Sequence, residues 1–162
     1  MRVSAQIYIS APPAAVWEVI SDPTRQLSYM SGITRWEVAG GEPVGLGARY
    51  RMLLRVGSAE VGGLIEVVEF VEPCEIAWTS VTGVDQRGRW RLRETTGART
   101  RVELRLAYGV AGSGLGGWLA EHVAAPTVTG HLRRSVQQLK RLVEAEQVRA
   151  RAAAKRAPAQ RA

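Results

Sequence analysis

Three side chains in this sequence could carry proton-transfer chemistry inside a cavity: Glu66, Tyr108 and His122. His122 falls on the apolar side of a long helical pattern, where burial favours the neutral imidazole, which both donates and accepts a hydrogen bond. Such a group could orient a ligand carbonyl or move a proton. Each candidate also has an ordinary structural interpretation, His122 as a packed histidine and Glu66 as a solvated residue, so catalysis remains one alternative.

Other chemical motifs in the chain do not meet their structural requirements. Residues 112–117 contain G-x-G-x-x-G, but no parallel strand is expected after the helix that follows, and Leu132 and Arg133 stand where a dinucleotide site needs an acid. Cys74, His122 and His131 lack the spacing of metal ligands. No Gly-x-Ser-x-Gly nucleophile elbow occurs. We therefore expect neither a metal nor a cofactor.

The start of the chain predicts one strand and two short helices. Residues 3–9 alternate apolar and polar side chains, which is the period of a strand. A helix that begins with two prolines follows at residues 12–20 and stops at Asp22-Pro23. Residues 25–30 predict a second short helix.

The middle of the chain predicts six further strands without intervening helices, at residues 33–38, 49–56, 64–71, 75–81, 87–93 and 100–108. Hairpin-like spacing between them favours an antiparallel sheet. Glu66 and Glu69 are three residues apart, which breaks strict alternation and predicts a bulge. Apolar residues at three- and four-residue steps then predict one long amphipathic helix from about residue 115 to about residue 148.

A single long helix after consecutive strands is best placed on the concave face of a curved sheet. The predicted fold is therefore α+β, with six or seven curved antiparallel strands wrapped around the C-terminal helix and two short helices after the first strand. A cavity between helix and sheet follows. The residues expected to line it lie on the inward faces of these elements: Tyr50, Met52, Leu54, Trp78, Trp90, Leu104, Leu106, Tyr108, Trp118 and His122.

The positive charge of the chain is concentrated at its end. The net charge is +7, and the five basic residues after Glu146 have no acidic residue among them. We expect one domain over residues 1–148 and a frayed or disordered basic tail over residues 149–162. The tail could make weak contact with an anionic membrane, but five cations without interleaved aromatics do not predict specific nucleic-acid binding.

Cysteine content and hydropathy predict where in the cell the protein is located. One cysteine permits no internal disulfide, and the first residues lack the apolar stretch of a signal peptide. No apolar run approaches the length of a membrane span. The expectation is a soluble, cytoplasmic protein, as a monomer or a homodimer.

Three segments resemble a known family: ISAPPAAVWEVISDP at residues 9–23, VEPCEIAW at 71–78 and LRRSVQQLKRLVE at 132–144. They resemble the polyketide cyclase/dehydrase and lipid-transport group, which is START-like or Bet v 1-like and part of the SRPBCC superfamily, over residues 1–146. The resemblance implies the helix-grip fold and a hydrophobic ligand, lipid-like or aromatic and polyketide-like. It leaves open a binding protein or, alternatively, an aromatase/cyclase that acts as a lyase through acid-base residues of the pocket.

Overall fold

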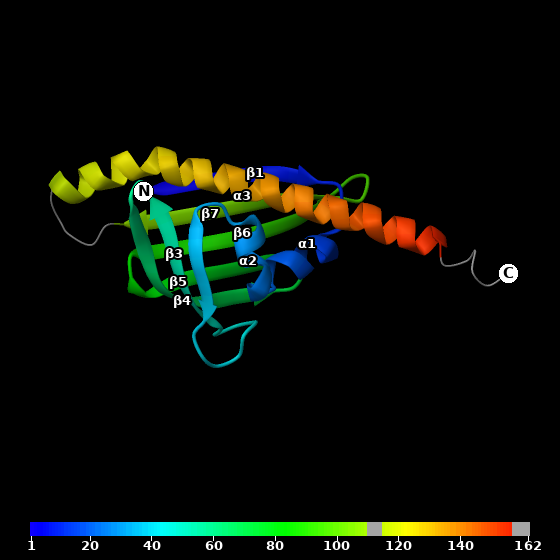
Figure 1. Cartoon of the computed structure of the whole chain (residues 1–162), viewed down its shortest axis with the longest axis horizontal. Helices are drawn as coiled ribbons and strands as arrows, with labels where there is room; N and C mark the ends of the chain where they lie inside the picture. The colour runs from blue at the N-terminus through cyan, green and yellow to red at the C-terminus, as the bar shows by residue number, and fades with distance from the viewer. Residues whose placement is uncertain (110–114, 157–162) are drawn as a thin grey trace.

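The computed structural model describes residues 1–109 and 115–156, with side chains described for residues 1–109 and 124–156. Seven strands form one antiparallel sheet in the order β1-β7-β6-β5-β4-β3-β2. Their bounds are β1 Arg2–Ile9, β2 Ile33–Val38, β3 Arg49–Val56, β4 Ala59–Val71, β5 Glu75–Gly83, β6 Asp85–Thr95 and β7 Arg99–Gly109. Consecutive strands from β2 to β7 are neighbours, so the sheet is a meander that β1 extends at the β7 edge (Figure 1). The predicted fold class is confirmed.

Short helices connect β1 to β2, as predicted. Helix α1 (Pro13–Ile20) buries Val16, Trp17, Val19 and Ile20. A 3-10 turn, η1 (Pro23–Arg25), and helix α2 (Gln26–Tyr29) follow. Asp22 caps the turn, since its Oδ1 accepts hydrogen bonds from Thr24 N at 2.9 Å and Thr24 Oγ1 at 2.6 Å.

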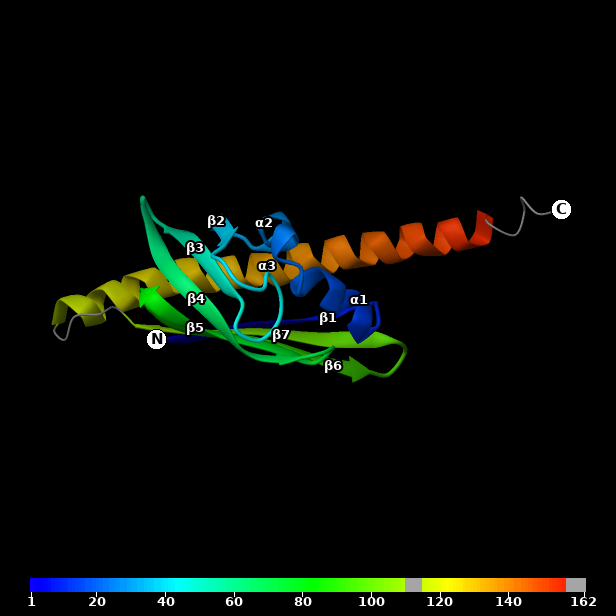
Figure 2. The same ribbon diagram turned by 90° about the horizontal axis from the view of Figure 1, so that it is seen from below.

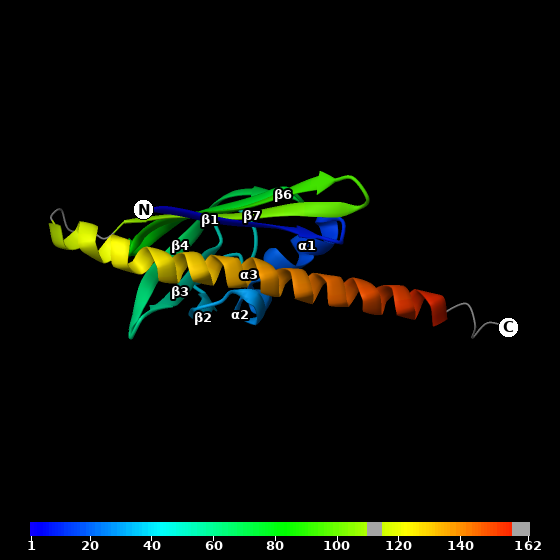
Figure 3. The ribbon, with the colours of Figure 1, turned by 90° about the horizontal axis from the view of Figure 1, so that it is seen from above.

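Helix α3 (Leu115–Arg156) is a single continuous helix of 42 residues. The sheet curls around α3, so that β2 and β3 lie on one side of the helix and β1 and β7 on the other (Figures 2 and 3). Side chains of α3 that are buried in this grip recur at three- and four-residue steps: Val128, Leu132, Ser135, Val136, Leu139 and Val143.

Val128 belongs to the buried stripe of α3, whereas Pro126, inside the same helix, is exposed. The helix also continues through the predicted tail as far as Arg156. Residues 149–156 are alanine, arginine and lysine, which are strong helix formers, so the helix extends without any packing to hold it.

Polar contacts fix the C-terminal half of α3 to the sheet and the short helices. Glu144 Oε1 accepts hydrogen bonds from Ser10 N at 2.8 Å and from Lys140 Nζ at 2.6 Å. Lys140 Nζ also donates to the carbonyl of Tyr8 at 2.8 Å. Arg25 and Glu146 form an ion pair. The register of α3 over the sheet is therefore set by groups that lie beyond its apolar stripe.

The irregularity predicted in β4 is present. The β4–β5 register shifts between Val67 and Glu69, so Val68 is an extra residue that no partner in β5 opposes. Its side chain is 49% exposed on the outer face. A bulge of this kind increases local twist, which helps the sheet to curl around α3.

Candidate functional site

A cavity of about 70 Å³ lies between α3, the short helices and the concave face of the sheet. Its wall is mostly apolar and aromatic, and it includes Trp36, Tyr50, Trp78 and Trp90. The strands supply these side chains because alternate residues point to the same face. This inner cavity has room for only a few water-sized groups, so a larger ligand must extend beyond it.

A second, more open cavity of about 690 Å³ continues from the first. It lies between the β3–β4 hairpin, the β5–β6 turn and the part of α3 that contains Ala124 and Val128. Four residues line both cavities: Met52, Leu54, Gln86 and Leu106. We call these four residues the junction. The volume of the outer cavity falls within the range of small-molecule sites.

One histidine, His131 of α3, connects the cavity wall to two other segments. Its Nε2 lies 3.0 Å from the carbonyl oxygen of Arg55, and since a carbonyl only accepts, Nε2 carries the proton. Its Nδ1 lies 2.9 Å from Arg134 Nη2 and 3.2 Å from Ser31 Oγ. A guanidinium only donates, so Nδ1 is the acceptor. Burial lowers the pKa of His131, which favours this neutral form.

The surroundings of His131 hold its ring in place. Ser135 Oγ donates to the His131 carbonyl at 2.8 Å and accepts from Ser31 N at 2.8 Å. Gly32 has a φ of +80°, and a Cβ there would come within 2.5 Å of the His131 ring. Both ring nitrogens are engaged, so His131 ties α3 to β3 and to the segment before β2 and is not poised as an acid or base.

Two further polar residues of the inner wall, Gln26 and Tyr50, are likewise hydrogen-bonded within the protein. Gln26 Nε2 donates to the carbonyl of Ile20 at 2.9 Å, and Gln26 Oε1 accepts from Tyr29 Oη at 2.8 Å. Tyr50 Oη donates to the carbonyl of Pro43 at 2.6 Å. Burial raises the pKa of Tyr50, so its hydroxyl stays protonated near neutral pH. The wall thus contains hydroxyl and amide groups with structural roles.

Most of the predicted lining residues for which side chains are described lie in the inner wall: Tyr50, Met52, Leu54, Trp78, Trp90, Leu104 and Leu106. Tyr108 lines the outer cavity. Trp118 and His122 lie outside the residues whose side chains the structure describes.

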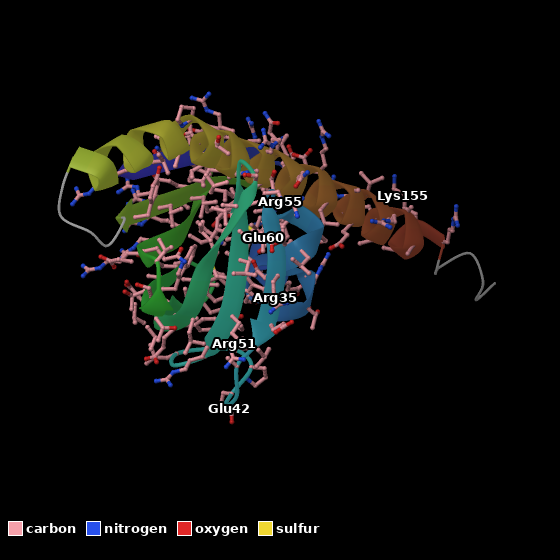
Figure 4. All side chains as sticks on the ribbon, turned by 60° about the vertical axis from the view of Figure 1, so that its left-hand side comes forward. Arg35, Glu42, Arg51, Arg55, Glu60 and Lys155 are labelled. Carbon is pink, nitrogen blue, oxygen red and sulfur yellow. The ribbon has the colours of Figure 1, made fainter. Side chains whose placement is uncertain are left out.

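Glu66 is placed on the other face of the sheet. Arg49 Nε donates to Glu66 Oε2 at 2.6 Å, and Glu66 lines neither the inner nor the outer cavity. The physical reason is the alternation of β4: the register pairs Glu66 with Arg49 of β3, and both side chains point away from α3. Figure 4 shows two more β3 arginines, Arg51 and Arg55, on this outer side.

The sequence reasoning did not place Trp36, Gln86 or His131 in the site. The ring of Trp36 stacks on Tyr50 at 5.0 Å between centroids, and Trp36 lines the inner cavity. Gln86 is buried, and its Nε2 lies 3.4 Å from Met52 Sδ. A signal for Gln86 existed: it extends the inward series of Gly88 and Trp90 by one more alternate position.

A third hollow, of about 900 Å³, lies on the outer face of β5, β6, β7 and β1. Arginines surround it, but several are neutralised. Arg89 pairs with Glu69 at 2.9 Å and also with Glu75, and Arg105 pairs with Glu103 at 2.8 Å. Surface pairs of this kind contribute little to stability, and they reduce the field that an anion would meet.

No group of three or more His, Cys, Asp or Glu side chains is placed to hold a metal ion in the described part of the chain. Among the same residues, no helix combines the length and the apolarity that crossing a membrane requires.

Comparison with known proteins agrees with this geometry. The family described as polyketide cyclase / dehydrase and lipid transport matches residues 1–144. No curated protein matches the chain. A solved structure from Thermus thermophilus, that of the protein TTHA0849, is 26% identical, with a TM-score of 0.76 over 90% of this chain and 99% of that one.

Two further solved structures share the fold at lower identity. The Zhui aromatase/cyclase of Streptomyces sp. R1128 is 18% identical, with a TM-score of 0.74 over 89% of this chain and 93% of that one. A START superfamily protein of Mycobacterium smegmatis is 15% identical, with a TM-score of 0.64 over 88% of this chain and 97% of that one.

Proposed function

The chain belongs to the polyketide cyclase / dehydrase and lipid transport family, and from that membership we propose that it binds a hydrophobic, lipid-like or aromatic small molecule between its sheet and α3. The observation that carries the proposal is the pair of cavities with mostly apolar walls, which share Met52, Leu54, Gln86 and Leu106. Apolar surface of this kind is the usual lining of a small-molecule site.

The state of the polar groups favours binding over catalysis. A general acid or base must have a proton site within reach of the substrate. In the inner wall both ring nitrogens of His131 are engaged by protein atoms, and Gln26 and Tyr50 have protein partners. The ligand would therefore meet a mostly apolar surface that selects by shape.

The alternative is an aromatase/cyclase that holds a poly-β-ketone and directs aldol closure and dehydration. One observation favours it: the architecture is shared with the Zhui aromatase/cyclase, with a TM-score of 0.74. This enzyme would use Tyr108 or His122 as its acid-base group, and it would show turnover of a poly-β-ketone substrate. Binding without turnover separates the two functions.

A filling substitution at the junction tests the proposal. Leu54→Trp adds bulk where the two cavities meet, so we expect the neutral fluorescent probe N-phenyl-1-naphthylamine to bind about tenfold more weakly, a change of about 1.4 kcal/mol. The matched control is Val68→Trp on the exposed bulge, which should leave the affinity unchanged. Equal affinities in the two variants, with both folded, would place the binding site elsewhere.

A further inference from the structure

Four arginines surround the small side chain of Ala107 in the hollow of about 900 Å³ on the outer face of the sheet. Leu106 of β7 lines the inner cavity, so Ala107, the next residue, points outward. The register places Arg2 of β1 on one side of Ala107 and Arg87 of β6 on the other. Neighbouring strands are about 4.8 Å apart, so the Cα atoms of these two arginines are about 10 Å apart.

The other two arginines, Arg89 of β6 and Arg105 of β7, form the adjacent row of the hollow. They are directly opposite each other in the register, two residues along from the row that contains Ala107. Like charges in that position are destabilising. Ala107 has no side chain beyond its Cβ, so nothing fills the space between the four guanidinium groups. We call Arg2, Arg87, Arg89 and Arg105 the arginine ring.

Glutamates neutralise only part of the arginine ring. Arg89 forms ion pairs with Glu69 and Glu75. Arg105 Nε donates to Glu103 Oε1 at 2.8 Å. A guanidinium has five N–H donors, and these pairs use only some of them. Arg89 and Arg105 therefore keep N–H groups that a ligand could use.

Arg2 and Arg87 carry the charge that is not neutralised. Both side chains are exposed, and among the described residues neither side chain forms an ion pair or a hydrogen bond. A fifth arginine of the hollow, Arg91, pairs with Glu75. Five arginines thus stand against the three glutamates of these pairs. The two positive charges that remain are those of Arg2 and Arg87.

Acidic side chains limit the positive patch along the strands. On β6, Asp85 lies two residues before Arg87, and on β7, Glu103 lies two residues before Arg105. The register places these two carboxylates at opposite ends of the arginine ring. A long polyanion such as a nucleic acid would meet their repulsion, whereas a short anion would not. The one aromatic residue of the described lining, Trp78, is buried, so bases would find no stacking surface.

We propose that this hollow binds a small molecule that carries a diphosphate group, held between Arg2 and Arg87 over Ala107. Arginine suits this ligand because its planar guanidinium donates two parallel hydrogen bonds to a phosphate. A diphosphate offers oxygens on two adjacent groups, so donors on both sides of Ala107 can bind it at once. The site lies on the face of the sheet opposite to the cavities under α3, and it does not depend on the proposed function.

Titration calorimetry of the full chain with inorganic pyrophosphate tests the inference. At an ionic strength of about 0.15 M, which screens distant surface charges, pyrophosphate should bind about tenfold more tightly than orthophosphate. Arg2→Gln and Arg87→Gln should each weaken pyrophosphate binding about tenfold, because each removes hydrogen bonds between charged groups. The matched control is Arg93→Gln. Arg93 is exposed on the same face of β6 but lies outside the hollow, so the affinity should stay unchanged.

Equal weakening by Arg87→Gln and Arg93→Gln would show only a general attraction of anions to a basic chain, and it would overturn the inference. Equal affinities for pyrophosphate and orthophosphate would also overturn it, and so would the absence of measurable pyrophosphate binding. All three substituted arginines are exposed, so the variants remove no buried contact and should fold. Any of these outcomes would leave the proposed function standing, because that function concerns the other face of the sheet.

A substitution at the centre of the arginine ring gives a second test. Ala107→Glu places a carboxylate where the diphosphate is expected, directly between Arg2 and Arg87. It should abolish pyrophosphate binding. It should not lower the Tm in a thermal melt, because the new carboxylate compensates charges that otherwise repel one another. Pyrophosphate binding that persists in folded Ala107→Glu would contradict the inference.

Discussion

His131 shows how one side chain acquires a defined protonation state from its neighbours. The carbonyl of Arg55 requires a proton on Nε2, and the guanidinium of Arg134 requires a lone pair on Nδ1. Burial lowers the pKa of His131 from its ordinary value of 6.5, and the charge of Arg134 lowers it further, while the hydrogen bond to Arg55 opposes both. Protonation would place a second donor against the Arg134 guanidinium, so the folded state favours the neutral ring.

This state predicts a dependence of stability on pH. The unfolded chain binds a proton at His131 more readily than the folded one, so the stabilisation is complete above about pH 6.5 and is lost as the pH falls through the folded pKa. His131→Gln removes the titrating group. Urea unfolding between about pH 7 and about pH 5 should therefore show a smaller loss of stability in the variant than in wild type. Equal losses in the two proteins would rule out this role for His131.

Helix α3 combines packing and polar contacts along the same stretch. Buried residues from Val128 to Val143 fill the curl of the sheet, while His131 and Lys140 within that stretch, and Glu144 and Glu146 just after it, make polar contacts to the segments around the helix. Gly130 lies inside the helix, next to His131. Glycine in a helix interior costs backbone entropy that alanine does not.

Gly130→Ala should therefore stabilise the protein. The new Cβ would meet Arg134 Nη1 at 3.3 Å, which is the end of a flexible side chain. We expect a gain of about 0.5–1 kcal/mol and a Tm higher by about 2–4 °C in a thermal melt. Gly32→Ala is the opposing control, since its φ is +80° and its Cβ would meet the His131 ring; it should lower the Tm. A lower Tm for Gly130→Ala would show that Arg134 cannot move aside.

At the scale of the molecule, the end of α3 projects away from the body (Figure 1). Residues 148–156 are exposed, and Val148 is 65% exposed. The last contacts to the body are made by Glu144 and Glu146. Four of the five basic residues at the end of the chain, Arg149, Arg151, Lys155 and Arg156, therefore lie on helix surface that packs on nothing in the described chain.

Truncation after Ala150 should leave the fold intact. Residues 151–156 are exposed and bury no core, so we expect a change in Tm of only a few degrees, measured by thermal melting. Truncation after Lys140 provides the contrast, because it removes the buried Val143 together with Glu144 and Glu146, and it should abolish folding or lower the Tm strongly. A large loss of stability on removing residues 151–162 alone would mean that the tail packs on the body or on a second subunit.

The sequence by itself determined the elements and their arrangement. The alternation within β1, β3, β6 and β7, the prolines around α1 and the apolar stripe of α3 are local patterns, each of which requires one secondary structure. The short spacing between strands then favoured a meander. A single long amphipathic helix can bury its apolar stripe by packing on the concave face of that sheet. The same alternation identified seven residues of the inner wall, including Trp78 and Trp90.

The tertiary structure decided which polar groups face the ligand and which are already paired. Glu66, a predicted site residue, instead pairs with Arg49 on the outer face of the sheet. Trp36 and Gln86, which were not predicted, line the inner cavity. His131 proved to be held by Arg55, 76 residues away in sequence, and Ser31, 100 residues away. A local pattern indicates which face of a strand or helix a residue lies on. Its hydrogen bonds and its burial depend on the residues that the curled sheet places opposite to it. Those residues are determined by the register between segments that are distant in sequence.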